Sequence, residues 1–333
     1  MQKRRTIWLA LTGAVLATAV TSGAAIASRA DTAKPGPTAP VPTMAGTPAA
    51  DTAALAKPGT TAGLPTSIVS DKAIALPAGA DLAGYSVVDS GSLANPKNAQ
   101  SYGLVNCPAG KVAFDGGVVA SSYSLYQNLN SSYPIVSSGL ATGWQAYVNN
   151  RSAADSTFVV YAVCAKKPAN YAVVSAAFAN GSYSQSNGSV QCPLNSSGRR
   201  MRVLGGGSYG ELSSLAQNIN STYPSGKDTW RVDNNNGSGT SALFKVYAVC
   251  GNKAGWTIAA GAPTANPSGE QSLAAAACPS DKISVGGGVF SNSSSTAVNL
   301  NTSWPKTQSS WMVYENNADP TDATITPYAV CLS

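Results

Sequence analysis

This 333-residue chain contains no histidine. The candidate side chains for chemistry are therefore its fifteen carboxylates and six cysteines. The absence of histidine excludes Ser-His-Asp and Cys-His nucleophile pairs, an imidazole general base and His-ligated zinc. Two neighbouring carboxylates, as in glycosidases and aspartic proteases, remain the candidate catalytic arrangement. Whether such a pair forms depends on how the chain is organised.

The segment 85–333 repeats one unit three times, starting at Tyr85, Tyr171 and Trp256. Each copy contains, in order, Cys-Pro, a glycine cluster, an Asn-x-Asn motif that ends in Tyr-Pro or Trp-Pro, a tryptophan, an Asn-Asn pair and a closing Tyr-Ala-Val-Cys. The tryptophan precedes the closing cysteine by 20 residues in every copy. Identical spacing at so many positions indicates a true internal repeat.

Carboxylates do not follow this repeat. Asp233 and Glu315 lie near equivalent positions, where copy one has Tyr147 and Val148. Asp115 stands where the other copies have glycine, so a catalytic pair built across copies stays open as an alternative. We expect a non-enzymatic protein, with a hydrolase that uses carboxylates of different copies as the less favoured hypothesis. Neither a cofactor nor a metal site is predicted, because the chain has no Cys-x-x-Cys motif.

Polar and aromatic positions do repeat, and they suggest a binding surface. Amide groups can hydrogen-bond sugar hydroxyls, and aromatic rings can stack on the flat apolar faces of sugars. The residues predicted on the strand face opposite the tryptophans, solvent-facing beside the Asn-Asn turn, are Tyr147 and Asn149, Asp233 and Asn235, and Tyr314 and Asn316. The candidate set is Tyr147, Asn149, Asn150, Asn235, Asn236, Tyr314, Asn316 and Asn317. The middle copy has Asp233 in place of the tyrosine and is expected to be a poorer or different site. The structural alternative is that these asparagines only form turns.

Residue alternation predicts β-strands throughout the repeats. Trp144 begins a strand in which apolar and polar residues alternate, and the stretch from each tryptophan to its closing cysteine is typical of a β-hairpin that turns at Asn-Asn. The returning strand, for example 158–164, is apolar on both faces and is predicted in the middle of a sheet. We expect the three tryptophans in the core and the glycine clusters at bulges or close backbone approaches.

The six cysteines fall two per copy at matching positions, and an N-terminal secretory segment would deliver them to an oxidising compartment. The sequence therefore predicts disulfides within copies. The expected pairs are Cys107–Cys164, Cys192–Cys250 and Cys278–Cys331.

The N-terminal part indicates export. Lys3, Arg4 and Arg5 precede an apolar run that ends in small residues, which predicts a signal peptide over 1–27, with cleavage after Ala27 or Ala30. The segment 28–84 is rich in Ala, Pro and Thr and is predicted to be a disordered spacer. Three β repeats follow at 85–165, 171–251 and 256–333. We expect a secreted, extracellular protein with no membrane span after signal cleavage.

These elements predict an all-β fold made of three tandem disulfide-tied repeats with a period of 86 and then 85 residues. Two arrangements fit the short linkers between copies. The repeats form either separate β-sandwich-like units in a row or one pseudo-threefold, β-prism-like body.

The pattern Cys-Pro, Gly-Gly-Gly, Tyr-Pro, Trp, Asn-Asn and Tyr-Ala-Val-Cys resembles a repeat found in uncharacterised secreted actinobacterial proteins. The resemblance covers all three copies, although copy one departs from it at Asp115. It implies export but no particular activity. The threefold layout is also distantly similar to vitelline-membrane outer-layer proteins, which implies only a β-prism fold.

Charge is sparse and argues against nucleic acid as a partner. Charged residues make up 11% of the chain, and removal of the three N-terminal cations leaves 18 basic against 15 acidic residues. Arg199, Arg200 and Arg202 form one basic cluster in an insertion, which we interpret as a solvated loop. The sequence favours a secreted binding or adhesion module for extracellular or cell-wall polysaccharide, or for another cell-surface component. A structural component of the cell envelope or spore surface is the alternative.

Overall fold

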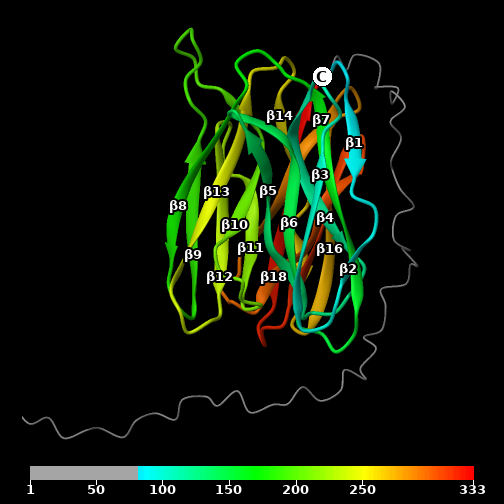
Figure 1. Cartoon of the computed structure of the whole chain (residues 1–333), viewed down its shortest axis with the longest axis vertical. Coiled ribbons are helices and arrows are strands. Elements are labelled where there is room, and N and C mark those ends of the chain that lie inside the picture. Colours follow the sequence, from blue (N-terminus) through cyan, green and yellow to red (C-terminus); the bar gives the residue numbers. More distant parts are fainter. Residues whose placement is uncertain (1–81) are drawn as a thin grey trace, which may run out of the picture. The chain divides into compact units, whose positions relative to one another are not determined.

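The computed structural model describes residues 82–333, and the following applies to that part of the chain. Twenty β-strands and no helix are found there (Figure 1), which confirms the all-β prediction. None of the described residues belongs to a helix of membrane-spanning length and hydrophobicity. The predicted signal peptide over 1–27, and all but the last three residues of the predicted spacer, lie outside the described residues.

The strands form three antiparallel sheets, each with the following strands in spatial order. Sheet A contains β1 (Ser86–Asp89), β7 (Ser156–Lys166), β4 (Lys111–Ala120), β18 (Val298–Thr307), β19 (Ser310–Asn317) and β16 (Glu270–Ala277), with β2 (Leu93–Asn95) also paired to β7. Sheet B contains β3 (Ala99–Asn106), β6 (Leu140–Asn150), β5 (Gln127–Ser137), β10 (Arg202–Gly210), β13 (Ala242–Gly251) and β8 (Ala172–Asn180). Sheet C contains β14 (Thr257–Ala260), β20 (Ala323–Leu332), β17 (Ile283–Ser291), β11 (Gln217–Pro224), β12 (Thr229–Asn236) and β9 (Ser184–Gln191), with β15 (Thr264–Asn266) paired to β20.

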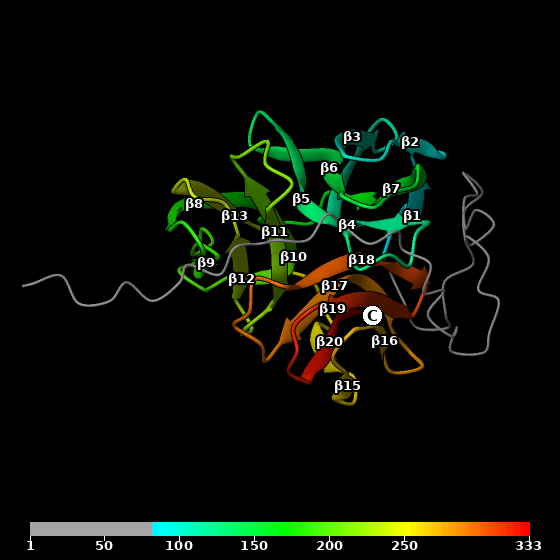
Figure 2. The same ribbon diagram turned by 90° about the horizontal axis from the view of Figure 1, so that it is seen from below.

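Every sheet takes its strands from two copies. Sheet A joins copies one and three, sheet B joins copies one and two, and sheet C joins copies two and three. Figure 2 shows the three sheets arranged around a shared interior, where one cluster of buried apolar side chains fills the space between them. This strand pairing excludes three separate sandwiches in a row.

The shared sheets also overturn the hairpin that the local pattern predicts. In copy one, β6 pairs with β3 and β5 in sheet B, whereas the returning strand β7 pairs with β1, β2 and β4 in sheet A. The Asn-Asn turn therefore carries the chain from one sheet to the next. The prediction that the returning strand lies inside a sheet is confirmed, since β7 lies between β1 and β4.

The seams, where strands of two copies meet, are the pairings of β4 with β18, β5 with β10 and β11 with β17. Each seam is a short contact, with one ladder pair: Val118 with Ser303, Ser208 with Ser132, and Val289 with Thr222. A glycine faces the neighbouring backbone at every seam. A Cβ atom on Gly117, Gly207 or Gly288 would collide with the carbonyl oxygen of Ser303, Ser132 or Thr222. The predicted close backbone approach is confirmed.

The core tryptophans lie directly behind these glycine strands. Trp144, Trp230 and Trp311 are fully buried, as expected, and each ring packs on the glycine that precedes the seam glycine. Each indole N–H donates to a hydroxyl of the Asn-x-Asn strand. The acceptors are Ser132, Thr222 and Ser303, at 2.9, 2.9 and 2.8 Å.

The three disulfides join the predicted partners, Cys107–Cys164, Cys192–Cys250 and Cys278–Cys331. The linked cysteines are 57, 58 and 53 residues apart in the chain. Closing loops of this length stabilises a fold by about 4 kcal/mol each in the loop-entropy description. Each disulfide also fastens a sheet to its neighbour, because the first cysteine follows a strand of one sheet and the second lies in a strand of another.

The folded part begins slightly earlier than the repeat pattern indicates. Leu82 is buried in the core, and the backbone N–H of Lys166 donates to the carbonyl oxygen of Ala83 at 3.0 Å. Residues 82–84, which the composition assigns to the spacer, therefore pack onto β7.

The seam geometry makes a testable prediction. Gly207→Ala should lower the free energy of unfolding by about 3 kcal/mol, at the upper end of the range for overpacking, because the new methyl group meets backbone that cannot rotate away. Gly226→Ala is the matched control, since its Cβ would meet only Thr229 at 3.9 Å. Chemical unfolding midpoints measure both, and equal stability of the two variants would show that the seam is not closely packed.

Candidate functional site

The first asparagine of each Asn-Asn pair links two copies instead of facing solvent. Asn149, Asn235 and Asn316 are fully buried. Their side-chain amides donate to the side-chain oxygens of Asn128, Asn218 and Asn299 in the same copy, each at 2.9 Å. They also donate to backbone carbonyls of the next copy, those of Gln217, Val298 and Gln127, at 2.9, 2.8 and 2.8 Å. The three contacts form a closed cycle of copies.

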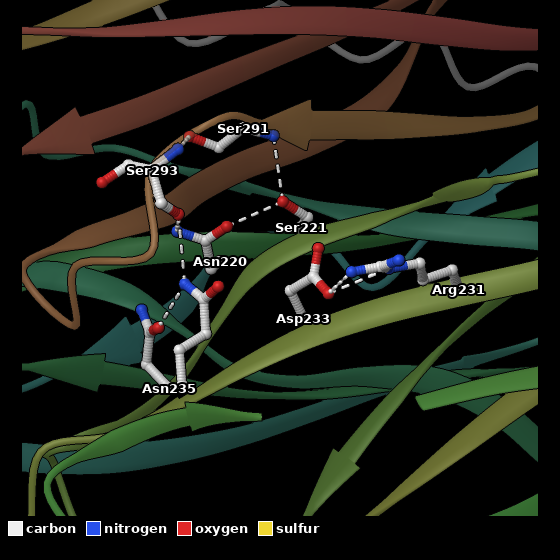
Figure 3. Close-up of polar contacts among 8 residues, drawn as sticks. Asn220, Ser221, Arg231, Asp233, Asn235, Ser291 and Ser293 are labelled. Carbon is white, nitrogen blue, oxygen red and sulfur yellow. Dashed lines mark hydrogen bonds and ion pairs between the residues drawn. The ribbon is translucent and has the colours of Figure 1, made fainter. Parts of the chain in front are cut away.

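The Asn-x-Asn motif supplies a second set of contacts at the same places. Asn130, Asn220 and Asn301 donate to the same three carbonyls of the next copy, at 3.0, 3.0 and 2.9 Å. Figure 3 shows one of these junctions, where Asn220, Ser221 and Asn235 of copy two lie beside Ser291 and Ser293 of copy three. There, the Ser291 N–H donates to the Ser221 hydroxyl at 2.9 Å.

The second asparagine of each pair shapes the turn that follows it. Asn150, Asn236 and Asn317 are also fully buried. The Asn150 amide donates to the carbonyl oxygens of Asn95 and Ala154 at 2.8 and 3.0 Å, and its oxygen accepts the Ser152 N–H at 3.0 Å. Asn236 and Asn317 make the corresponding contacts.

The prediction that Asn149, Asn235 and Asn316 face solvent is therefore wrong, and the other three candidate asparagines are buried as well. Their amides make hydrogen bonds to other groups of the protein, at the seams and turns. Some of these groups belong to distant segments of the chain. Asn149, for example, lies on the outward face of β6 but is covered by the segment before β11, where it also donates to the Leu215 carbonyl at 3.4 Å. The structural alternative, in which asparagine serves the turns, applies to the second member of each pair.

The middle copy has a buried side chain at the position that corresponds to Tyr147. Asp233, predicted to face solvent, is buried and accepts from Arg231 Nε and Nη2 at 3.0 and 2.9 Å (Figure 3). Burial raises the pKa of Asp233, although the Arg231 guanidinium acts in the opposite direction.

Two other carboxylates are fully buried, so neither can reach a substrate. Asp115 lies between β4, β10 and β17, where its oxygens accept the N–H groups of Gly116 and Gly287 at 2.8 and 2.9 Å. Burial raises the pKa of Asp115, and the backbone N–H groups that face it offset part of that effect. Asp115 therefore fills the space at the meeting point of three strands and does not belong to an accessible carboxylate pair.

Glu315 is the second buried carboxylate. Burial raises its pKa from 4.5 to about 8. Among the described residues, no donor reaches either carboxyl oxygen in hydrogen-bonding geometry.

The two candidate tyrosines lie on the outer faces of different sheets. Tyr314, on β19 of sheet A, is partly buried, and its ring centre lies 6.3 Å from that of Tyr123. Tyr147, on β6 of sheet B, is also partly exposed and belongs to a larger aromatic group. The structure therefore does not bring Tyr147 and Tyr314 into one site.

That group, which we call the tyrosine row, consists of Tyr102, Tyr147, Tyr209, Tyr133 and Tyr247. Each tyrosine comes from a different one of five neighbouring strands of sheet B. In the order of the residues just given, these strands are β3, β6, β10, β5 and β13. Successive ring centres in that residue order are 4.9, 6.4, 5.1 and 5.4 Å apart. The row is unbroken, and the exposed fraction of its tyrosines ranges from 46% for Tyr102 to 9% for Tyr133.

The other two sheets carry only parts of this row. Sheet C keeps Tyr223, Phe290 and Tyr328 in contact but has Asn187 and Asp233 where sheet B has Tyr102 and Tyr147. On sheet A the residues at the positions of Tyr102 and Tyr209 are Leu273 and Val119. The sequence pattern predicted only Tyr147 of the row as a binding residue, although the repeated Tyr-Pro and Tyr-Ala-Val-Cys motifs contain Tyr133 and Tyr247.

The asparagine contacts predict a loss of stability when one of them is removed. Asn235→Ala should lower the free energy of unfolding by about 2–3 kcal/mol, because it leaves the buried Asn218 oxygen without its donor and weakens a seam. Asn187→Ala, on the exposed face of β9, should change stability by less than about 0.5 kcal/mol. Urea unfolding of both variants measures the difference, and an unchanged Asn235→Ala protein would make Asn235 a binding candidate again.

Glu315 predicts a pH dependence of stability. Its folded-state pKa of about 8 lies above the unfolded value of 4.5, so the folded protein keeps a proton that the unfolded chain releases. Its contribution to stability therefore falls as pH rises from about 4.5 towards about 8. Glu315→Gln should add a few kcal/mol at pH 8, at about 1.4 kcal/mol per pKa unit, and little at pH 5. Exposed Glu270→Gln is the control, and a gain for Glu315→Gln that is the same at both pH values would contradict the assignment.

No family model matches this chain, and no curated protein matches it.

Proposed function

We propose that this chain is a secreted, non-enzymatic glycan-binding protein and that the tyrosine row on sheet B is its binding face. The observation that carries the proposal is the unbroken series of ring contacts across five neighbouring strands. Neighbouring strands lie about 4.8 Å apart, so the row extends over roughly 20 Å. A row of that length presents stacking positions to several consecutive sugar rings of a polysaccharide.

The chemistry of the row suits sugars. Aromatic rings stack on the apolar faces of pyranoses, and phenol hydroxyls both donate and accept hydrogen bonds. Burial, together with neighbouring phenols, raises the pKa of Tyr102 and Tyr133. Their hydroxyls therefore stay protonated at neutral pH. The Tyr102 hydroxyl donates to Gln145 Oε1 at 2.9 Å, which adds an amide beside the rings.

Secretion and the absence of catalysis are supported by other features. Three disulfides fit an oxidising compartment, in agreement with the predicted signal peptide over 1–27. The two fully buried carboxyls, Asp115 and Glu315, have no access to a substrate. A polysaccharide remains the favoured partner because the row offers stacking positions on several neighbouring strands.

Retention on insoluble polysaccharides tests the proposal. We expect the full chain to be retained on at least one of cellulose, chitin and purified peptidoglycan. The double variant Tyr102→Ala/Tyr147→Ala should bind about tenfold more weakly, since each ring contact of this kind contributes about 0.5–1.5 kcal/mol. Tyr126→Ala, which removes an exposed tyrosine outside the row, is the control and should bind like the parent.

The outcomes separate this function from the alternative. If none of the three polymers retains the full chain, or if the double variant binds like the parent with an unchanged melting temperature, the tyrosine row is not a glycan site. Assembly of the chain into large particles without polysaccharide retention would support the structural role at the cell envelope or spore surface.

A further inference from the structure

A basic cavity lies at a second place on the molecule, away from the residues of the tyrosine row. It has a volume of about 960 Å³ and is lined by the insertion after Cys192, the turn between β11 and β12, and the segment that joins β13 to β14. Its cationic side chains are Arg199, Arg200, Arg202, Lys227 and Lys253. None of the described residues that line it is acidic.

This concentration of charge does not stabilise the fold. Cations held near one another repel, and the repulsion raises the free energy of the protein without a ligand. Asp228, beside the cavity, lies 3.9 Å from Arg200 Nε and offsets the charge of that arginine. The cavity therefore has a strong net positive charge, which favours an anionic occupant.

The insertion that contributes two of the arginines is an ordered loop. Val203, Ala113 and Ser284 each pair with the closing cysteine of their copy. Eleven positions separate Cys192 from Val203, against six between the corresponding residues of the other copies, so copy two has five extra residues. The Asn195 side-chain oxygen accepts the N–H groups of Ser197 and Arg199 at 3.1 and 2.9 Å. Arg200 Nη1 donates to the Cys192 carbonyl at 2.9 Å. The loop is exposed, as expected, and its arginines also line the cavity.

Comparison with the other copies shows that copy two differs at this point. Val112 and Ile283 occupy the position of Arg202, and both are buried apolar side chains. The lysines that precede them, Lys111 and Lys282, are used internally. Lys111 donates to the Ser86 hydroxyl at 3.0 Å, and Lys282 donates to the Gly255 carbonyl at 2.6 Å. Arg202 instead lies over the Trp256 ring, with its guanidinium carbon 5.6 Å from the ring centre.

Trp256 fixes this arrangement. Its Nε1–H donates to the Val203 carbonyl at 2.7 Å, which orients the ring at the cavity wall. A guanidinium stacked on a ring keeps its N–H donors in a defined plane, and that plane matches two oxygens of a carboxylate, sulfate or phosphate.

We propose that this cavity binds the oxyanion groups of an acidic polysaccharide segment. Arg199, Arg202 and Lys227 pair with sulfate, phosphate or carboxylate groups, and the Trp256 ring contacts a sugar face. The site is separate from the tyrosine row and does not depend on it. A polysaccharide fits better than an isolated anion, because the cavity volume exceeds that of a single phosphate and includes an aromatic wall.

Calorimetric titration of the full chain with one polymer backbone in four forms tests the proposal. The probes are dextran, dextran sulfate, dextran phosphate and carboxymethyl-dextran, each in about 0.1 M salt. We expect at least one charged form to bind at least tenfold more tightly than dextran, and this preference should fall as salt concentration rises. The charged form that binds most tightly identifies the oxyanion.

Two double variants with the same change in net charge locate the site. Arg199→Gln/Lys227→Gln should weaken binding of the preferred charged dextran about tenfold. Lys97→Gln/Lys306→Gln, at exposed positions elsewhere, should weaken it less than about twofold. Equal losses in both variants, or no loss in the first with an unchanged melting temperature, would overturn the site. Tighter binding of a short DNA duplex than of any charged dextran would overturn the ligand class.

The tyrosine variant keeps this test independent of the proposed function. Tyr102→Ala/Tyr147→Ala should retain the preference for charged over uncharged dextran, and Arg199→Gln/Lys227→Gln should retain binding to the insoluble polymer. Loss of charge preference in the tyrosine variant would show that the two sites are one.

Discussion

Buried backbone groups need hydrogen-bond partners, and the rest of this structure depends on how that need is met where the copies join. Each seam has one ladder pair, so strand pairing alone supplies few of the hydrogen bonds between copies. Side-chain amides of Asn130, Asn220 and Asn301 reach across and donate to backbone carbonyls of the next copy. The tryptophans, the glycine strands and the disulfides then hold each copy in the position that these contacts require.

This use of amides determines which surfaces are left for ligands. The polar residues that repeat most regularly make hydrogen bonds inside the protein. Regular repetition in this protein therefore indicates a structural role. Both proposed binding sites lie at places where the copies differ. Sheet B differs from sheets A and C by a complete series of tyrosines, and copy two differs from its neighbours by the five-residue insertion beside Trp256.

Features encoded within one copy could be predicted from the sequence. The disulfide partners, the buried tryptophans and the central returning strand depend on spacing and alternation that every copy shows. The predicted hairpin and the exposed asparagines are wrong for one reason: their true neighbours lie in another sheet or another copy. Tyr102 and Tyr209 are 107 positions apart in the chain, and no local pattern indicates that their strands share a sheet. The basic cavity likewise combines three separate segments.

Asp115 has a consequence for how such a molecule can arise. A chain with one copy has half of each sheet it needs, so three identical chains would have to close the ring as a trimer. A carboxylate at this position would then occur three times around one point, and the charges would repel in a space that holds one side chain. With glycine at two of the three places, a single carboxylate fits. Linking the three copies in one polypeptide therefore allows a residue at this point that three identical chains could not all carry.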